Sequence, residues 1–321
     1  FSKELYGRQR LFGTLSYAVV TLVSAFLMDI VGQETLFVLV PASALIFGLV
    51  LIISAPSDTP PTREERLKRK QQTKQEQSDT GNTRSPIVIL LTSPTYLFFL
   101  LAVFMTGLAR ATMTHFLALF WKKKMLLSNK QIAMGSISGI VLEVVIFYFG
   151  PRVSASLGNH WMLLLAQAAM ALRSWLYFVM PDSPKWYPAV LAVELLKGVA
   201  FGFTHLAGVK TAAAAAPPGL QATSQSIYNA IYAQLPAVIA AFAGARLYAS
   251  LGPHILFMIV AVISTVSMAA FFLKYIFDGS ISVKQSRDKR RPNPVITVDP
   301  VFGDEEEGMG GVVTADQVIK K

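Results

Sequence analysis

The sequence predicts an all-α transmembrane bundle, and three properties lead to this fold class. Apolar residues make up 53% of the 321 residues and charged residues 15%, well below the charged fraction of about 25% that is usual in soluble domains. Repeated stretches of about 20 mostly apolar residues are each long enough to cross a bilayer as a helix. Lys and Arg are concentrated in those connecting segments that lie on one side, and this asymmetry orients membrane proteins.

Eight segments qualify as membrane spans. Approximately, they cover residues 11–30, 35–54, 93–120, 132–150, 161–180, 187–209, 222–248 and 255–275. Between the second and third spans, residues 55–92 are polar with a charged core, and we predict a cytoplasmic loop there. After the last span, residues 276–321 combine a basic cluster, an acidic run and glycines, and we expect a disordered cytoplasmic tail.

The basic residues predict that both termini lie on the cytoplasmic side. When Arg246 and Lys274, which lie near the ends of their spans, are counted with the adjoining outer loop and tail, 20 of the 29 Lys and Arg lie in cytoplasmic segments, 6 in outer loops and 3 inside spans. Three lysines directly after Trp121 are the exception, and we expect their side chains to snorkel at the interface. The basic runs at 63–74 and 284–291 are expected to contact anionic lipid, and no nucleic-acid partner is predicted.

The layout is asymmetric, because two spans precede the long basic loop whereas six spans and a tail follow it. Many secondary transporters consist of two six-helix halves joined by such a loop, with the binding site between the halves. On this interpretation residues 1–54 are the last two helices of the first half, 55–92 are the central loop, and 93–275 are the second half. About four further helices would then precede Phe1. The alternative is an eight-helix protein of another fold.

Charged side chains inside the spans are candidates for function, because a charge at mid-bilayer costs about 2.5–3.5 kcal/mol or more. The candidates are Arg110, Glu143, Arg173, Glu194, Lys197 and, three turns after Glu194, His205. Glu194 and Lys197 are three residues apart, so they share a helix face and can pair with each other. The open alternative is that these charges form buried ion pairs that only hold helices together.

Two spans also carry polar side chains at helical spacing, which places them on one face. The first span carries Arg10, Thr14 and Tyr17, and the seventh carries Gln225, Tyr228, Asn229 and Tyr232. Such amides, hydroxyls and rings suit a solute with hydroxyl groups or a heterocycle. Hydrogen bonding between helices explains the same pattern equally well. Glycines at 198, 202 and 208 of the sixth span are expected to be close-packing or hinge positions and not binding residues.

Four motifs in register resemble one family. The segment YGRQRLFGTLSY at 6–17 resembles the start of the fifth helix in the oligosaccharide and nucleoside proton symporters of the major facilitator superfamily. It is still more similar to the related proteins that resemble the macrophage MHC class I receptor homologue. FGPRVSASLG at 149–158, ELLKGVAFG at 194–202 and APPGLQATSQS at 216–226 resemble that family's turn between helices eight and nine, its tenth helix and the start of its eleventh. The resemblance covers about residues 4–275.

The resemblance implies a twelve-helix bundle and a role in solute binding for three residues. Arg10 matches the arginine that binds sugar hydroxyls in lactose permease. Thr14 and Tyr17 match its neighbours on that face of the cavity, with Tyr17 in the place of a stacking tryptophan.

The resemblance also implies which residues couple transport to protons. Arg173 falls on the helix-nine arginine implicated in coupling, and Glu143 corresponds to the helix-eight acid. Lys197 occupies the place of a histidine, and Ala200 stands where the family carries an acid. Glu194 is a candidate substitute for that acid.

These features predict a secondary active transporter, a proton-coupled symporter of a small polar solute such as a sugar or nucleoside, that works by alternating access. The proton is the expected coupling ion, and no other cofactor or metal is expected. The alternatives are a receptor or scaffold with the same fold, which Ala200 would allow, and an inactive truncated transporter. No enzyme motif is recognisable, and the absence of cysteine excludes disulfides and thiol catalysis. We expect a multi-pass protein of the plasma membrane or of an internal membrane.

Overall fold

The structure is a computed structural model that describes residues 6–32, 34–54, 86–217 and 219–278. These residues are almost entirely helical. The long helices are α1 (Tyr6–Ile30), α2 (Thr35–Ser54), α5 (Pro94–Lys123), α6 (Asn129–Tyr148), α8 (Asn159–Val179), α9 (Tyr187–Ala215) and α12 (Ala245–Phe277). The short elements are α4 (Pro86–Thr92), α7 (Gly150–Leu157), η2 (Pro184–Trp186), α10 (Gln221–Asn229), η3 (Ala230–Gln234), α11 (Leu235–Ile239) and η4 (Ala240–Gly244).

Seven helical stretches of the described residues are long and apolar enough to span a membrane, and the last of them represents two spans. This stretch runs over 57 residues from Gln221 to Phe277, whereas a helix of about 20 residues already crosses the hydrocarbon core. It is broken at Gly252, where φ is +82° and the helix does not continue. The break allows the chain to turn back, so this stretch contains the two separate spans that the sequence predicts at 222–248 and 255–275.

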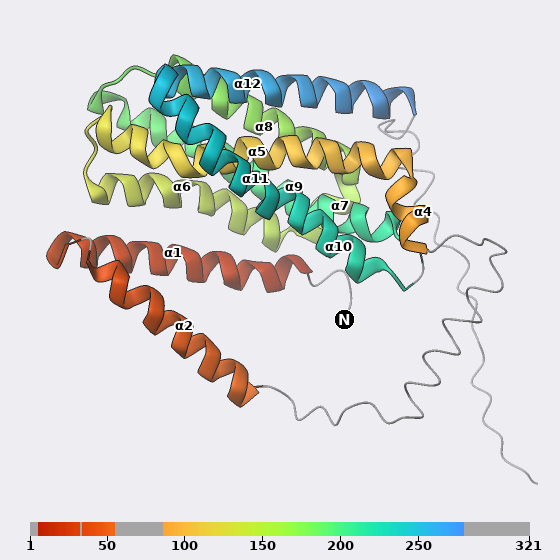
Figure 1. Cartoon of the computed structure of the whole chain (residues 1–321), viewed down its shortest axis with the longest axis horizontal. Coiled ribbons are helices and arrows are strands. Elements are labelled where there is room, and N and C mark those ends of the chain that lie inside the picture. Colours follow the sequence, from red (N-terminus) through yellow and green to blue (C-terminus); the bar gives the residue numbers. More distant parts are fainter. Residues whose placement is uncertain (1–5, 33, 55–85, 218, 279–321) are drawn as a thin grey trace, which may run out of the picture. The chain divides into compact units, whose positions relative to one another are not determined.

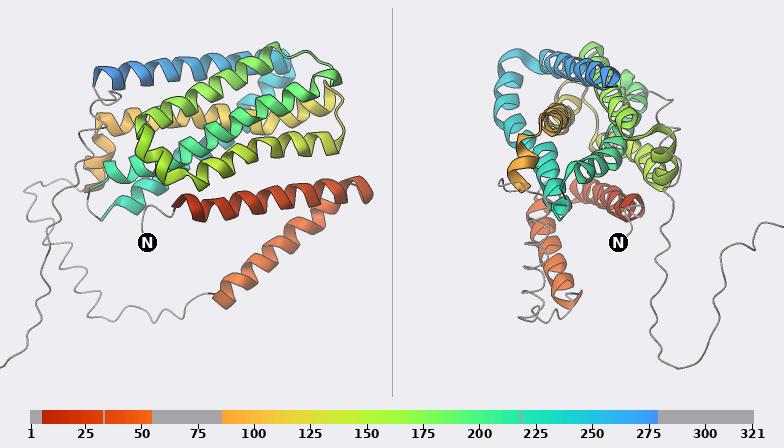
Figure 2. Two further views of the ribbon diagram at one scale, coloured as in Figure 1. Left: turned by 180° about the vertical axis from the view of Figure 1, so that it is seen from behind. Right: turned by 90° about the vertical axis from the view of Figure 1, so that its right-hand side faces the viewer.

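The helices run roughly alongside one another and their connections alternate between two ends (Figure 1). The connections that were predicted to be cytoplasmic, namely α4, α7 and the start of α10, lie at the same end. α5 lies in the middle of the group, as the end-on view shows (Figure 2), with α12, η3, α11 and η4 among its neighbours. Two short helices were not anticipated. α4 falls within the predicted loop 55–92, and α7 replaces the predicted short turn.

Two clusters of buried apolar side chains hold the six spans from α5 to α12 together. The first lies toward the end that carries α4 and includes Phe99, Phe147 and Phe271. The second lies toward the opposite end and includes Phe120 and Phe257. All five phenylalanine side chains are at most 1% exposed. Because lipid tails are as apolar as these side chains, the clusters stabilise a membrane bundle through close van der Waals packing and not through removal of apolar surface from water.

α6 and α9 approach each other so closely that glycine is required at their contact. A Cβ atom at Gly198 would collide with the backbone carbonyl of Gly139, and one at Gly202 with Ile146. Further along α9, a Cβ at Gly208 would collide with the ring of Tyr228. The predicted close-packing role of these α9 glycines is therefore confirmed.

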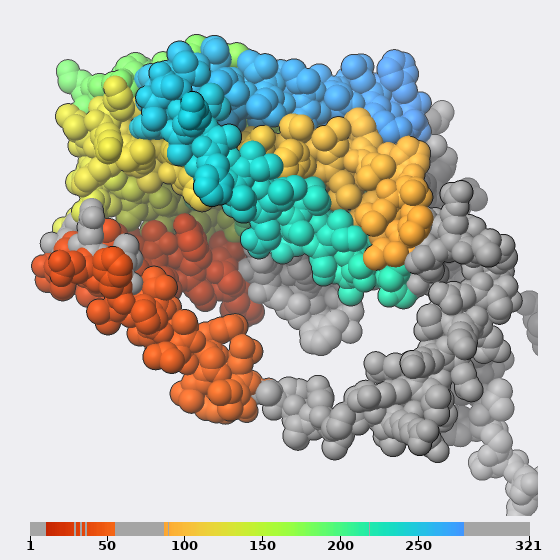
Figure 3. Space-filling view, viewed as in Figure 1, coloured from red at the N-terminus to blue at the C-terminus, as the bar shows by residue number. Residues whose placement is uncertain are grey.

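The segment from α10 to the start of α12 crosses α5 obliquely and is interrupted by two π-helical turns (Figure 3). The first π turn, η3, ends two residues before Pro236, which has no N–H to donate to the carbonyl of Tyr232. That carbonyl points at α5, where a Cβ at Gly107 would collide with it. π turns of this kind occur frequently at functional sites, and this one holds Tyr232.

α1 packs against α6, whereas α2 contacts mainly α1. The most apolar part of α2 has no buried residue, and Phe37 and Ile52 are 83% and 77% exposed. Such apolar side chains suit a lipid or helix environment, in agreement with an integral membrane protein. On α1, Thr14 is buried and directed toward the site.

Candidate functional site

A cavity of about 390 Å³, whose wall carries four charged side chains, lies between α1, α5, α6, α8, α9 and η3. Its volume is within the range of about 300–1,000 Å³ that is usual for small-molecule sites. Charged groups from four of these helices converge on it, together with hydroxyls and three aromatic rings. Its lining residues are Gly13, Thr14, Tyr17, Arg110, Thr114, Ile140, Glu143, Met170, Arg173, Lys197, Phe201 and Tyr232.

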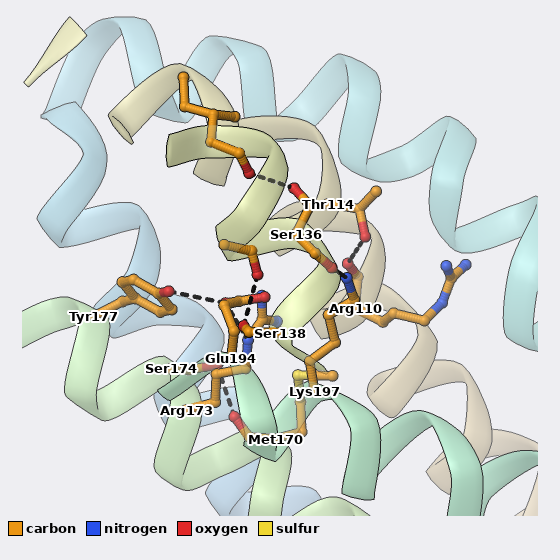
Figure 4. Close-up of polar contacts among 12 residues, drawn as sticks. Arg110, Thr114, Ser136, Ser138, Met170, Arg173, Ser174, Tyr177, Glu194 and Lys197 are labelled. Carbon is orange, nitrogen blue, oxygen red and sulfur yellow. Dashed lines mark hydrogen bonds and ion pairs between the residues drawn. The ribbon is translucent and has the colours of Figure 1, made fainter. Parts of the chain in front are cut away.

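Arg173 and Glu194 form a buried ion pair between α8 and α9 (Figure 4). Nε and Nη2 of Arg173 donate to Oε1 of Glu194 at 3.0 and 2.8 Å, and the hydroxyl of Tyr177 donates to the same oxygen at 2.8 Å. The side chains of this pair are 5% and 1% exposed. With three donors on one carboxylate oxygen, the charge of Glu194 is well compensated.

In the described structure Glu194 and Lys197 do not form the ion pair that their spacing on one helix allows. Nζ of Lys197 donates instead to the backbone carbonyl of Ser136 on α6 at 2.8 Å (Figure 4). The reason is the packing between helices, which presents the guanidinium of Arg173 directly to Glu194 and leaves Lys197 to face α6 and the cavity. Spacing along one helix does not contain this information.

Thr14 and Glu143 connect α1 with α6. The hydroxyl of Thr14 donates to Oε1 of Glu143 at 2.6 Å, and both side chains are 6% exposed. Tyr17, one turn further along α1, also lines the cavity but is 56% exposed. Arg10 belongs to the same predicted face of α1, but its side chain lies outside the described residues.

Arg110 of α5 lies over the ring of Tyr232, with its guanidinium carbon 5.1 Å from the ring centroid. Its Nε atom is buried and has no hydrogen-bond partner among the described residues. A cation over an aromatic face is attracted by the ring, so Tyr232 holds the guanidinium at the cavity. This arginine was predicted as an intramembrane charge, and the structure places it in the cavity wall.

The predicted stripe on the seventh span contributes one residue to the cavity, Tyr232. Tyr228 is buried behind it, with its ring parallel to that of Tyr232 at 5.9 Å and its hydroxyl donating to the carbonyl of Thr204. Gln225 is half-buried and Asn229 exposed, and neither lines the cavity. Gln225, Tyr228 and Asn229 lie in α10, before η3 begins at Ala230, whereas Tyr232 lies within η3.

His205 lies behind the cavity wall and not in it. Its ring packs against Phe201 at 4.2 Å and against Tyr232 at 5.3 Å, and the residue is 5% exposed. These ring contacts place His205 behind the aromatic wall of the cavity, and the protonatable line from Glu194 to His205 stays a prediction.

Several residues of the site were not predicted from the sequence. Tyr177 follows Arg173 by four residues, so its place on the same helix face is a signal that was available. Thr114 is likewise one turn after Arg110. Met170 and Phe201 gave no signal, because an apolar residue in a membrane helix is equally consistent with a lipid contact.

The comparison with protein families agrees with this architecture. The model of the family described as MFS_1 like family matches residues 2–259. The chain belongs to the MFS_1 like family. Its bundle of apolar helices is thus a major facilitator superfamily fold, and the protein is an integral, multi-pass membrane protein. A search of the curated proteins gives no match.

Membership in the MFS_1 like family indicates a membrane transporter and not an enzyme. In this MFS_1 like protein the cavity can offer a solute charged donors, hydroxyls and aromatic faces in one place. Such a combination fixes the orientation of a small polar molecule.

Proposed function

We propose that this protein is a proton-coupled symporter of a small polar solute, which binds in the cavity and crosses the membrane by alternating access. One observation carries the proposal. Thr14 and Tyr17 of α1 line the same cavity as the ionisable groups of the helices from α5 to α9. Transporters of this class bind their solute near the bilayer midplane between two rocking bundles.

The chemistry of the wall supports binding of a polar solute with a ring or hydroxyl groups. Hydroxyls of Thr14, Tyr17 and Thr114 border the space, and the rings of Phe201 and Tyr232 supply apolar faces. Hydroxyls both donate and accept hydrogen bonds, so they suit the hydroxyls of a solute, and aromatic faces suit its ring.

Two carboxylates are candidates for carrying the proton, and their contacts differ. Glu194 joins α8 to α9 through Arg173, within one group of spans. Glu143 accepts from Thr14 of α1 and so connects two groups of spans. We assign the coupling proton to Glu143 first, because a change in its protonation alters a contact between the elements that must move relative to each other. Protonation of Glu194 would release Arg173 and is the second route.

The proposal is tested with purified protein in liposomes. A pH gradient should drive uptake of a sugar or nucleoside found in a binding screen. Glu143→Gln should retain exchange of solute across the membrane but lose the acceleration by the gradient. Uptake that keeps its full dependence on pH in Glu143→Gln and also in Glu194→Gln would show that the coupling assignment is wrong.

A receptor or scaffold without transport is the second candidate, and Ala200 is the observation that favours it. This residue stands where the family resemblance implies an acid, and it is 1% exposed within an apolar cluster. Solute exchange in liposomes decides between the two. Exchange at any pH excludes the scaffold, whereas binding without exchange supports it.

A further inference from the structure

The charges at the cavity do not balance among the described residues. Of the residues that the structure describes, Arg110, Arg173 and Lys197 line it together with one acid, Glu143. Glu194 lies behind Arg173 and compensates it. Among these described side chains three cations therefore face two carboxylates, which leaves one positive charge in excess. An uncompensated charge at this depth is costly unless something neutralises it.

Arg110 is the cation with the clearest unused binding capacity. Among the described residues no carboxylate lies within ion-pair distance of it, and its buried Nε has no acceptor. Tyr232 holds the guanidinium from one face, which leaves the N–H edge available. Lys197, on the same cavity, donates to a neutral backbone carbonyl, so its positive charge is also not paired with an acid there.

We propose that the transported solute carries one carboxylate and that Arg110 binds it, with Lys197 adding attraction. This inference rests on the proposed function and specifies its substrate class. The planar fork of an arginine matches a carboxylate through two parallel hydrogen bonds. A monoanion neutralises the single excess charge, whereas a phosphate monoester with about two negative charges would exceed it. The hydroxyls around the cavity then suit a hydroxylated acid, such as a sugar acid.

The test is thermal unfolding of the purified protein with four acids, each beside a neutral counterpart. The pairs are glucuronate and glucose, galacturonate and galactose, gluconate and sorbitol, and lactate and propane-1,2-diol. We expect at least one acid to raise the unfolding temperature in a saturable manner while its counterpart does not. Arg110→Gln should weaken the apparent affinity for that acid by about 30-fold or more. The matched control is Arg246→Gln, because Arg246 is exposed and does not line the cavity. It should bind the acid as the wild type does.

Three outcomes overturn the inference: no acid binds, the neutral counterparts bind as well as the acids, or Arg110→Gln keeps the wild-type affinity. Its failure differs from failure of the proposed function. If a neutral solute binds and is driven by a pH gradient, the carboxylate inference is wrong and symport stands. If an acid binds through Arg110 but no gradient drives its uptake, the site stands and symport is wrong.

Discussion

The first two helices and the six spans that follow them differ in how far their side chains are buried by the rest of the described structure. α2 has no buried residue in its most apolar part, and its side chains depend on surroundings outside the described structure. The spans from α5 to α12 contain two apolar clusters and a buried ion pair. The difference indicates that the six spans are stabilised by contacts among themselves. α1 adds the hydrogen bond from Thr14 and part of the cavity wall.

The largest expected effect lies in the six spans, at the buried ion pair. Arg173→Gln should lower the free energy of unfolding by about 3–5 kcal/mol, because it leaves Glu194 buried without its cation. Denaturant titration in mixed micelles measures this loss. The matched control is Arg110→Gln, which removes a cation with no acid partner among the described residues. It should cost far less, and equal losses in the two variants would contradict the charge balance described for the cavity.

A pair of glycine substitutions compares the two regions directly. Gly198→Val should destabilise by about 1–3 kcal/mol or more, because α6 leaves no space for a side chain at this position. Gly48→Val on α2 meets open space and should have little effect on unfolding in the same titration. If both variants are equally stable, the close contact of α6 with α9 is not as described.

The contact between the two regions is expected to have a smaller effect on stability. Thr14→Val removes one donor to Glu143, and loss of such a buried partner costs about 1–3 kcal/mol. Thr21→Val is the matched control, because Thr21 donates to Tyr17 of its own helix. Cross-linking between cysteines introduced into α1 and α6 should weaken in Thr14→Val and stay unchanged in Thr21→Val. An unchanged yield in both would show that Thr14 does not hold α1 to α6.

The smallest effect is expected at the end of the six spans that is opposite α4. His254 bonds to Asp182 through Nε2 and to the carbonyl of Phe178 through Nδ1, each at 2.9 Å. The His254 and Asp182 side chains are about one-third exposed, so Asp182→Asn should cost about 0.2–1 kcal/mol. A loss comparable with that of Arg173→Gln would contradict the view that buried charges dominate this region.

Features that belong to a single helix, namely its span and the charges within it, could be predicted from the sequence. Apolar length predicts the spans, and charges within them identify Arg110, Glu143, Arg173 and Lys197, all of which line the cavity. Pairing between helices could not be predicted, because it depends on how α8 and α9 pack. The stripe on the seventh span partly failed because spacing along one helix does not show which of its residues reach the cavity, and of the four Tyr232 lines it.

Solute-driven proton movement in liposomes tests the central claim most directly. Addition of a solute that binds the cavity should acidify the interior of liposomes containing the wild-type protein, and the same addition should give no pH change with Glu143→Gln, although solute exchange continues. Proton movement of equal size in the wild type and in Glu143→Gln would contradict the assignment of this cavity as the coupled site.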